Sequence, residues 1–133
     1  MSDNTQTASA EGGPSREKVW LKSYPKGVPP EIGDLPCNSV GALFQNSCQT
    51  YANRLAFSCM GKSITYGELD TLARKVGAWL QSRGLQKGDR VAIMMPNVLQ
   101  YPIAIAGILR AGLIAVNVNP LYTPRELEHQ LND

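Results

Sequence analysis

The chain has 133 residues, which is the length of about one domain, and 43% of them are hydrophobic while 18% are charged. This composition can bury a core, so a multidomain machine and an intrinsically disordered chain are both excluded. The 13 Lys and Arg side chains against 11 Asp and Glu leave a net charge of +2. A balance so near neutrality excludes dedicated nucleic-acid binding, which needs a basic surface.

The cysteines Cys37, Cys48 and Cys59 are too few and too far apart for a disulfide scaffold or a C-x-x-C metal site. We therefore expect reduced thiols in a cytoplasmic protein. Residues 1–13 lack the charged and apolar regions of a secretory signal, so no export is expected.

One largely apolar stretch, residues 98–118, is long enough to cross a bilayer. It contains Arg110, which is costly at a bilayer centre, and Gly112, a residue that commonly ends a soluble helix. The pattern therefore favours a soluble helix followed by a strand.

The first third of the chain is predicted to contain a tail, an irregular arm and a helix, in that order. Residues 1–17 are rich in small polar side chains and are predicted to form a disordered tail, whereas the prolines of residues 19–36 predict an irregular arm. Ser39 is the expected N-cap of a first helix over residues 40–53. The apolar residues that share one face of this helix are Val40, Leu43, Phe44, Cys48 and Tyr51.

Residues 55–59 and 63–66 flank Gly61-Lys62 and predict a small antiparallel hairpin. Thr65 and Glu68 then have the spacing of a capping box, and Gly84 is placed to end the helix that follows. The residues predicted to form the buried face of this helix are Leu69, Leu72, Ala73, Val76, Trp79 and Leu80.

Two apolar runs, residues 90–95 and 113–118, are typical of strands covered on both faces, which favours parallel pairing. Asn97 is predicted to cap an intervening helix that reaches about Ala111, with Pro102 disturbing its start. Strand, helix and strand form a right-handed βαβ unit. The architecture is therefore α/β, with a small hairpin plus a parallel βαβ unit.

Thr123, Pro124 and Glu126 have the cap, N1 and N3 positions of another helix. An α/β sheet needs further strands to cover its faces. We therefore expect residues 18–133 to be the N-terminal portion of a larger, incomplete α/β domain.

Two short sequence motifs partly match the patterns of known binding sites. Gly61-Lys62-Ser63 ends like a phosphate-binding loop, but Ala56 stands at the place of the first glycine and no helix follows directly, which favours a hairpin turn. Glu126 and His129 have the i, i+3 spacing of a di-iron ligand pair, yet a second pair is lacking, which favours an ordinary helix surface.

Other polar positions have a functional and a structural interpretation. Pro96-Asn97 and residues 117–120 follow the carboxyl ends of the parallel strands, where open α/β sheets bind ligands, but capping and turn formation explain the same residues. Cys48 and Cys59 lack an activating neighbour and are interpreted as small hydrophobes. The residues alone predict a fold and no catalytic, cofactor-binding or metal-binding residue.

Several segments, taken in order along the chain, match the motifs of one family. Residues 64–69 (Ile-Thr-Tyr-Gly-Glu-Leu) and residues 109–112 with 114–120 resemble the first and second core motifs of the AMP-forming adenylating enzymes. Residues 85–92 and 95–97 lie between these motifs in the expected order. Residues 19–25 and 120–133 are most similar to bacterial long-chain fatty acid–CoA ligases, and the resemblance extends over about residues 18–133.

This resemblance implies a reaction that depends on ATP and Mg²⁺. A fatty carboxylate attacks the α-phosphate of ATP to give an acyl-adenylate and pyrophosphate, and the thiol of coenzyme A then displaces AMP. Such enzymes are cytoplasmic, are often attached peripherally to the inner membrane, and are commonly homodimers.

The phosphate loop of the family, its adenine and ribose motifs and its C-terminal lysine have no match in this chain. The resemblance therefore transfers no catalytic, cofactor-binding or metal residue to residues 1–133. We expect a truncated N-terminal segment that is inactive alone and binds no ATP, Mg²⁺ or coenzyme A by itself. The alternatives are a small nucleotide-binding α/β module and a non-catalytic interaction fragment.

Overall fold

The computed structural model describes residues 18–133, and the chain divides into two compact units at Leu35 and Pro36, each described here by itself. The predicted disordered tail, residues 1–17, lies outside the described residues. In the first unit a 3-10 helix, η1 (Val19–Ser23), is followed by extended backbone at Tyr24. Lys18 and Glu31 form an ion pair. The predicted irregular arm is confirmed.

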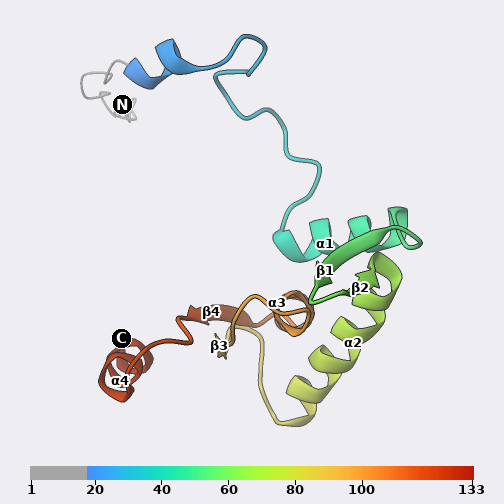
Figure 1. The fold of residues 1–133 in the computed structure, drawn as a ribbon, viewed down its shortest axis with the longest axis vertical. Helices are drawn as coiled ribbons and strands as arrows, with labels where there is room; N and C mark the ends of the chain where they lie inside the picture. Colours follow the sequence, from blue (N-terminus) through green and yellow to red (C-terminus); the bar gives the residue numbers. More distant parts are fainter. Residues whose placement is uncertain (1–17) are drawn as a thin grey trace, which may run out of the picture. The chain divides into compact units, whose positions relative to one another are not determined.

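The second unit contains the predicted helices and strands in the predicted order, and Figure 1 shows their arrangement. They are α1 (Val40–Thr50), β1 (Leu55–Cys59), β2 (Lys62–Thr65), α2 (Tyr66–Ser82), β3 (Arg90–Met94), α3 (Gln100–Arg110), β4 (Ile114–Val118) and α4 (Pro124–Asn132). The first helix ends three residues earlier than the pattern predicted.

Side-chain caps begin three of the helices. The Ser39 hydroxyl accepts a hydrogen bond from the Ala42 N–H at 3.1 Å and so caps α1. Thr65 and Glu68 form a complete capping box on α2, and Thr123 and Glu126 form another on α4. These caps satisfy N–H groups that have no partner inside the helix, which explains why these helices start where the sequence predicted.

Strands β1 and β2 pair antiparallel, with an irregularity between Leu55 and Phe57. Their turn consists of Met60 and Gly61, which both have positive φ, at 48° and 72°. Two residues of this kind match the right-handed twist of a hairpin. The predicted hairpin is confirmed, but Lys62 belongs to β2 rather than to the turn.

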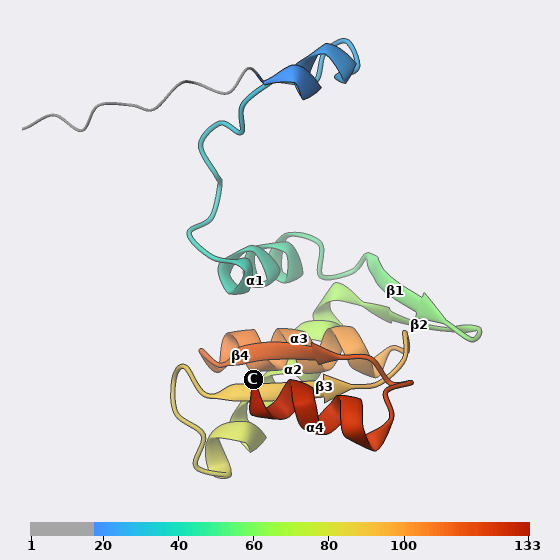
Figure 2. The same cartoon turned by 90° about the vertical axis from the view of Figure 1, so that its left-hand side faces the viewer.

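Strands β3 and β4 pair in parallel, with Val91 opposite Ala115 and Ile93 opposite Asn117. Together with α3 they form the predicted strand–helix–strand unit, and Figures 1 and 2 show the two strands between α3 and α4. On the α3 side, a buried cluster joins the sheet to α2 and α3: Leu80, Ile93, Ile108 and Leu113.

The sheet is covered less completely than predicted, because Met94 and Ile114 have exposed side chains. At the outer edge of β4, the Gln130 Nε2 of α4 donates to the Asn117 carbonyl at 3.0 Å. The Gln130 Oε1 is buried and has no hydrogen-bond partner among the described residues. Helix α4 therefore contacts the edge of the sheet through the NH₂ group of the Gln130 amide, while the oxygen of the same amide is not used by the described residues.

Helices α2 and α3 pack closely through two glycines. A Cβ atom on Gly107 would lie 2.7 Å from the Val76 Cβ and 2.9 Å from the Ala73 carbonyl oxygen. A Cβ on Gly77 would lie 3.1 Å from the Gly107 carbonyl oxygen. A side chain at Gly107 would therefore overlap Val76 and the Ala73 carbonyl, whereas one at Gly77 would be tight against the α3 backbone.

The predicted buried face of α2 is wrong at one position. Leu69, Ala73 and Leu80 are buried, but Trp79 is 60% exposed. The fourth buried residue is Gly77, which lies against α3. At 100° per residue, Gly77 belongs to the same side of the helix as Ala73, whereas Trp79 belongs to the solvent side.

The prediction that Asn97 caps α3 is also wrong. The helix begins at Gln100 after Leu99, which makes no side-chain cap, so Pro102 is its third residue. The N–H groups of the first turn have no intrahelical partner, so a proline there removes no helical hydrogen bond. No described helix is both long and apolar enough to cross a membrane.

Candidate functional site

An apolar pocket of about 420 Å³ lies where α1, β1 and the start of α3 meet. Its volume is in the range of small-molecule sites. Three segments that are distant in sequence form its walls: Phe44 of α1; Phe57, Ser58 and Cys59 of β1; and Asn97, Val98, Leu99, Tyr101, Pro102 and Ile105 of the β3–α3 connection and α3. Phe57 remains 40% exposed.

The connection between β3 and α3 is held to the hairpin at this pocket. The Cys59 thiol donates to the Asn97 carbonyl, with 3.4 Å between sulfur and oxygen. Asn97 is therefore part of a pocket wall at the carboxyl end of β3 rather than a helix cap. The wall contains no acidic, basic or histidine side chain. Such a pocket can bury an apolar group, but it offers no carboxylate, imidazole or amine for acid–base chemistry.

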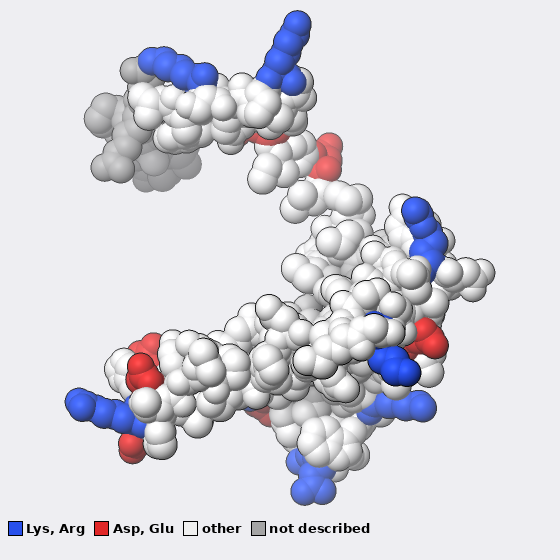
Figure 3. Space-filling view, viewed as in Figure 1, with Lys and Arg blue, Asp and Glu red and all other residues white. Residues whose placement is uncertain are grey.

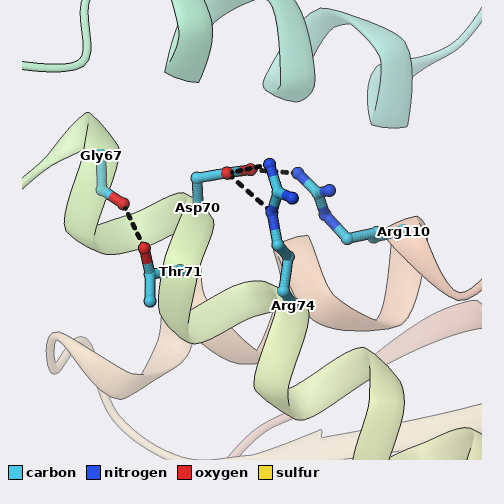
Figure 4. Close-up of polar contacts among 5 residues, drawn as sticks. All are labelled: Gly67, Asp70, Thr71, Arg74 and Arg110. Atoms are coloured by element: carbon cyan, nitrogen blue, oxygen red, sulfur yellow. Dashed lines mark hydrogen bonds and ion pairs between the residues drawn. The ribbon is translucent and has the colours of Figure 1, made fainter.

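A polar cluster lies on the other side of α3, where that helix meets α2 (Figure 4). The Asp70 carboxylate accepts from the Arg74 Nε at 2.9 Å and also forms an ion pair with Arg110. The Asp70 side chain is 16% exposed and that of Arg110 is 26% exposed. This carboxylate joins α2 to α3 and neutralises the cation that ends α3.

Cys48 lies close to this cluster, on the wall of a second pocket of about 260 Å³ that Asp70 and Arg110 also line. Burial raises the pKa of the Cys48 thiol, the negative charge of Asp70 raises this pKa further, and Arg110 lowers it. A raised pKa keeps the thiol protonated near neutral pH, and a protonated thiol is a poor nucleophile. Cys48 is 5% exposed and packs in a core cluster with Leu69 and Ala73, so it is the small hydrophobe that was predicted, and the nearby cation Arg110, which was not predicted, does not offset its burial.

The phosphate-loop motif forms a hairpin, as the mismatched spacing favoured. Gly61 lies in the turn, whereas Lys62 and Ser63 belong to β2. The Ser63 hydroxyl is hydrogen-bonded to the Ser58 hydroxyl of β1 at 2.6 Å. No helix N-terminus follows this glycine directly, so the motif lacks the geometry that binds phosphate.

Glu126, one member of the i, i+3 pair on α4, belongs to the capping box of that helix. The Glu126 carboxylate accepts from the Thr123 N–H at 2.8 Å and from the Thr123 hydroxyl, and these bonds lower the pKa of Glu126. His129 is exposed in the same helix. Within residues 18–133, no group of three or more His, Cys, Asp or Glu side chains could hold a metal ion. Asn119 accepts from the Leu121 N–H, which confirms its turn role.

The pocket and the α2–α3 cluster were not predicted from the sequence. The spacing of Asp70 and Arg74, four residues apart on a helix, could have indicated their local ion pair. Arg110 is 40 residues from Asp70, and no local pattern links them. The pocket walls come from three segments, so no single periodicity marks them.

The sequence and the fold match known proteins. The AMP-binding enzyme family matches residues 44–133. The long-chain-fatty-acid–CoA ligase of Yersinia pestis is 58% identical over 118 residues, which are 88% of this chain and 21% of that protein. The chain thus spans about a fifth of the length of the curated relatives it matches.

Two solved structures share the fold. The N-terminal subdomain of Klebsiella oxytoca NpsA has a TM-score of 0.69 and 28% identity, over 72% of this chain and 25% of its own. A benzoate CoA ligase from Burkholderia xenovorans LB400 has a TM-score of 0.65 and 30% identity, over 69% of this chain and 19% of its own. The fold is that of the N-terminal part of an adenylation domain. The chain belongs to the AMP-binding enzyme family.

Proposed function

We propose that this chain is the N-terminal part of a long-chain fatty acid–CoA ligase. The observation that carries the proposal is the 58% identity to the Yersinia pestis ligase over 88% of the chain. The whole enzyme would use ATP, accompanied by Mg²⁺, to convert a fatty carboxylate to an acyl-adenylate with release of pyrophosphate. Coenzyme A would then form the thioester and release AMP.

Within that enzyme, residues 18–133 serve as scaffold and supply no catalytic residue. Adenylation depends on cations and backbone donors preorganised around the phosphates. The described features are of another kind: a hairpin in place of a phosphate loop, a neutralised Arg110, and a pocket without acidic or basic side chains. The groups that bind ATP would come from the remainder of the enzyme.

Reversible attachment of the cytoplasmic enzyme to a membrane surface is also part of the proposal. Trp79 is exposed on α2, with Lys75 one turn before it and Arg83 one turn after it. Figure 3 shows Lys and Arg side chains on the surface of the part of the chain that contains α2. An exposed tryptophan between cations suits the interface of an anionic bilayer.

The resemblance also implies a homodimer. Light scattering of the whole enzyme would measure its mass and so test this oligomeric state.

A small nucleotide-binding module is not proposed. The β3–α3 connection, residues 95–99, contains no glycine and lines an apolar pocket. Dinucleotide and phosphate sites need glycines at this strand-to-helix turn, so that the backbone can approach the phosphates.

A chimera tests the ligase proposal. This chain would replace the matched 118 residues of the Yersinia pestis ligase, and AMP release would be measured with ATP, coenzyme A and palmitate. We expect activity from the chimera and none from the 133-residue chain, assayed by ATP–pyrophosphate exchange. An equivalent replacement from the Bacillus subtilis ligase is the control. Exchange by the pure chain, or a folded chimera without activity, would contradict the proposal.

A further inference from the structure

The apolar pocket and the hairpin beside it expose apolar side chains that the described residues leave uncovered. Phe57 lines the pocket from β1, Leu55 is exposed at the start of the same strand, and Met60 in the turn is 91% exposed. Figure 2 shows the hairpin extending beyond the helices. Large apolar side chains exposed together on one hairpin are typical of a contact site.

The pocket is also already formed. The Cys59–Asn97 hydrogen bond holds one wall to the other, and Pro102 and Ile105 belong to a regular helix. An occupant therefore needs to bring only apolar side chains, because the walls do not have to be rearranged to receive them.

The chemistry of the walls disfavours an anionic occupant, because no Lys, Arg or His lines them. A fatty carboxylate in this pocket would meet no cation, and the Ser58 hydroxyl is already bonded to Ser63. A charge buried without a partner is costly. An anionic bilayer would likewise find no Lys or Arg in these walls, in contrast to the surface around Trp79.

We propose that, in the full-length AMP-binding enzyme, this pocket is filled by apolar side chains from the polypeptide beyond the matched segment. The matched relatives are about five times as long as this segment. Most of the polypeptide that could pack over the pocket therefore lies outside the segment. Phe57 then becomes buried at an intramolecular interface between the hairpin and a later part of the enzyme. This proposal rests on family membership and chain length, and not on ligase activity.

Thiol alkylation of the unsubstituted proteins tests it. Iodoacetamide would be applied to the 133-residue chain and to the Yersinia pestis chimera, and each cysteine would be followed by mass spectrometry. Cys59 lines the pocket, whereas Cys37 lies outside it and is also partly exposed. We expect Cys59 to react at least ~10-fold more slowly in the chimera, and the rate of Cys37 to change less than ~2-fold.

A pair of aspartate substitutions gives a second readout. Phe57→Asp should have little effect on the proteolysis rate of the 133-residue chain, where the side chain is partly exposed, but should raise that of the chimera at least ~10-fold. Trp79→Asp is the matched control, because it changes an exposed aromatic residue outside the pocket and should leave the proteolysis rates of both proteins unchanged. If Phe57→Asp unfolds the short chain, the alkylation result still decides.

Equal reactivity of Cys59 in both proteins would overturn the proposal. So would protection of Cys59 in the 133-residue chain by one equivalent of palmitate, because the pocket would then be a ligand site. An inactive chimera in which Cys59 is protected would leave this inference standing while the ligase proposal failed.

Discussion

The two sides of α3 differ in how completely they are packed. On the α2 side, Gly77 and Gly107 bring the backbones together, and the Asp70–Arg110 ion pair joins the helices. On the hairpin side, an open apolar pocket lies between α3 and β1. The comparison shows that the described residues complete the contacts on one side of α3 and leave an apolar pocket open on the other. Substitutions on the completed side should therefore affect this chain most.

The largest effect is expected at Gly107. Gly107→Ala should lower the free energy of unfolding by about 3 kcal/mol, because the new methyl group would overlap Val76 and the Ala73 carbonyl. Urea unfolding followed by circular dichroism measures this change. Gly41→Ala is the control, since a Cβ there would meet nothing closer than 3.5 Å. It should be neutral or stabilise by up to ~1 kcal/mol, and equal losses at both glycines would refute close packing as the cause.

The next largest effect is expected at Asp70. Asp70→Asn should cost about 2 kcal/mol, because it leaves the partly buried Arg110 without its counter-charge. Double-mutant cycles with Arg110→Gln and Arg74→Gln would separate the two ion pairs. The coupling to Arg74 should be weaker, since its side chain is 61% exposed. A stronger coupling to Arg74 would show that the link between helices is not the main contribution.

A much smaller effect is expected at Trp79. Trp79→Asp should change the free energy of unfolding by less than ~0.5 kcal/mol, because the side chain is on the solvent side of α2. Thermal and urea unfolding of the 133-residue chain measure it. Loss of the folded state would instead restore the sequence-based prediction that Trp79 belongs to the buried face.

The smallest effect is a pH dependence from the capping boxes. Hydrogen bonds from Thr65 and Thr123 lower the pKa values of Glu68 and Glu126 from 4.5. A pKa that is lower in the folded state stabilises the fold above the unfolded value, and this contribution is lost as the pH falls through the folded value. Stability should therefore decline below about pH 4.5, and Glu68→Gln with Glu126→Gln should flatten that decline. An unchanged slope in the double variant would assign the decline to other carboxylates.

The predictions from sequence were most accurate where local signals set the structure. The capping residues Thr65 and Thr123 lie within three residues of the groups they bond, so the starts of α2 and α4 could be predicted. The ends of α2 and α3 could be predicted for an equally local reason, because Gly84 and Gly112 adopt the positive φ that ends a helix. The hairpin and the parallel pairing followed from short apolar runs.

The failures arose where distant contacts decide. Asn97 is a competent cap by residue type, but its connection bonds to Cys59 of the hairpin and α3 starts later. Trp79 is apolar, yet close approach of α3 placed Gly77 in the contact. The pocket depends on three segments at once, and no pattern within one of them indicates it.

The Gln130 contact has a consequence for the outer edge of β4. Ile114 donates to the Asp89 carbonyl, so alternate residues of β4, including Asn117, direct their backbone groups to the outer edge. An open edge of this kind can pair with a strand of another copy. Gln130 occupies the Asn117 carbonyl and leaves its own Oε1 buried without a partner among the described residues. Helix α4 thus occupies one backbone acceptor of the β4 edge with a side chain, so a strand of another copy cannot pair with that carbonyl while the contact holds.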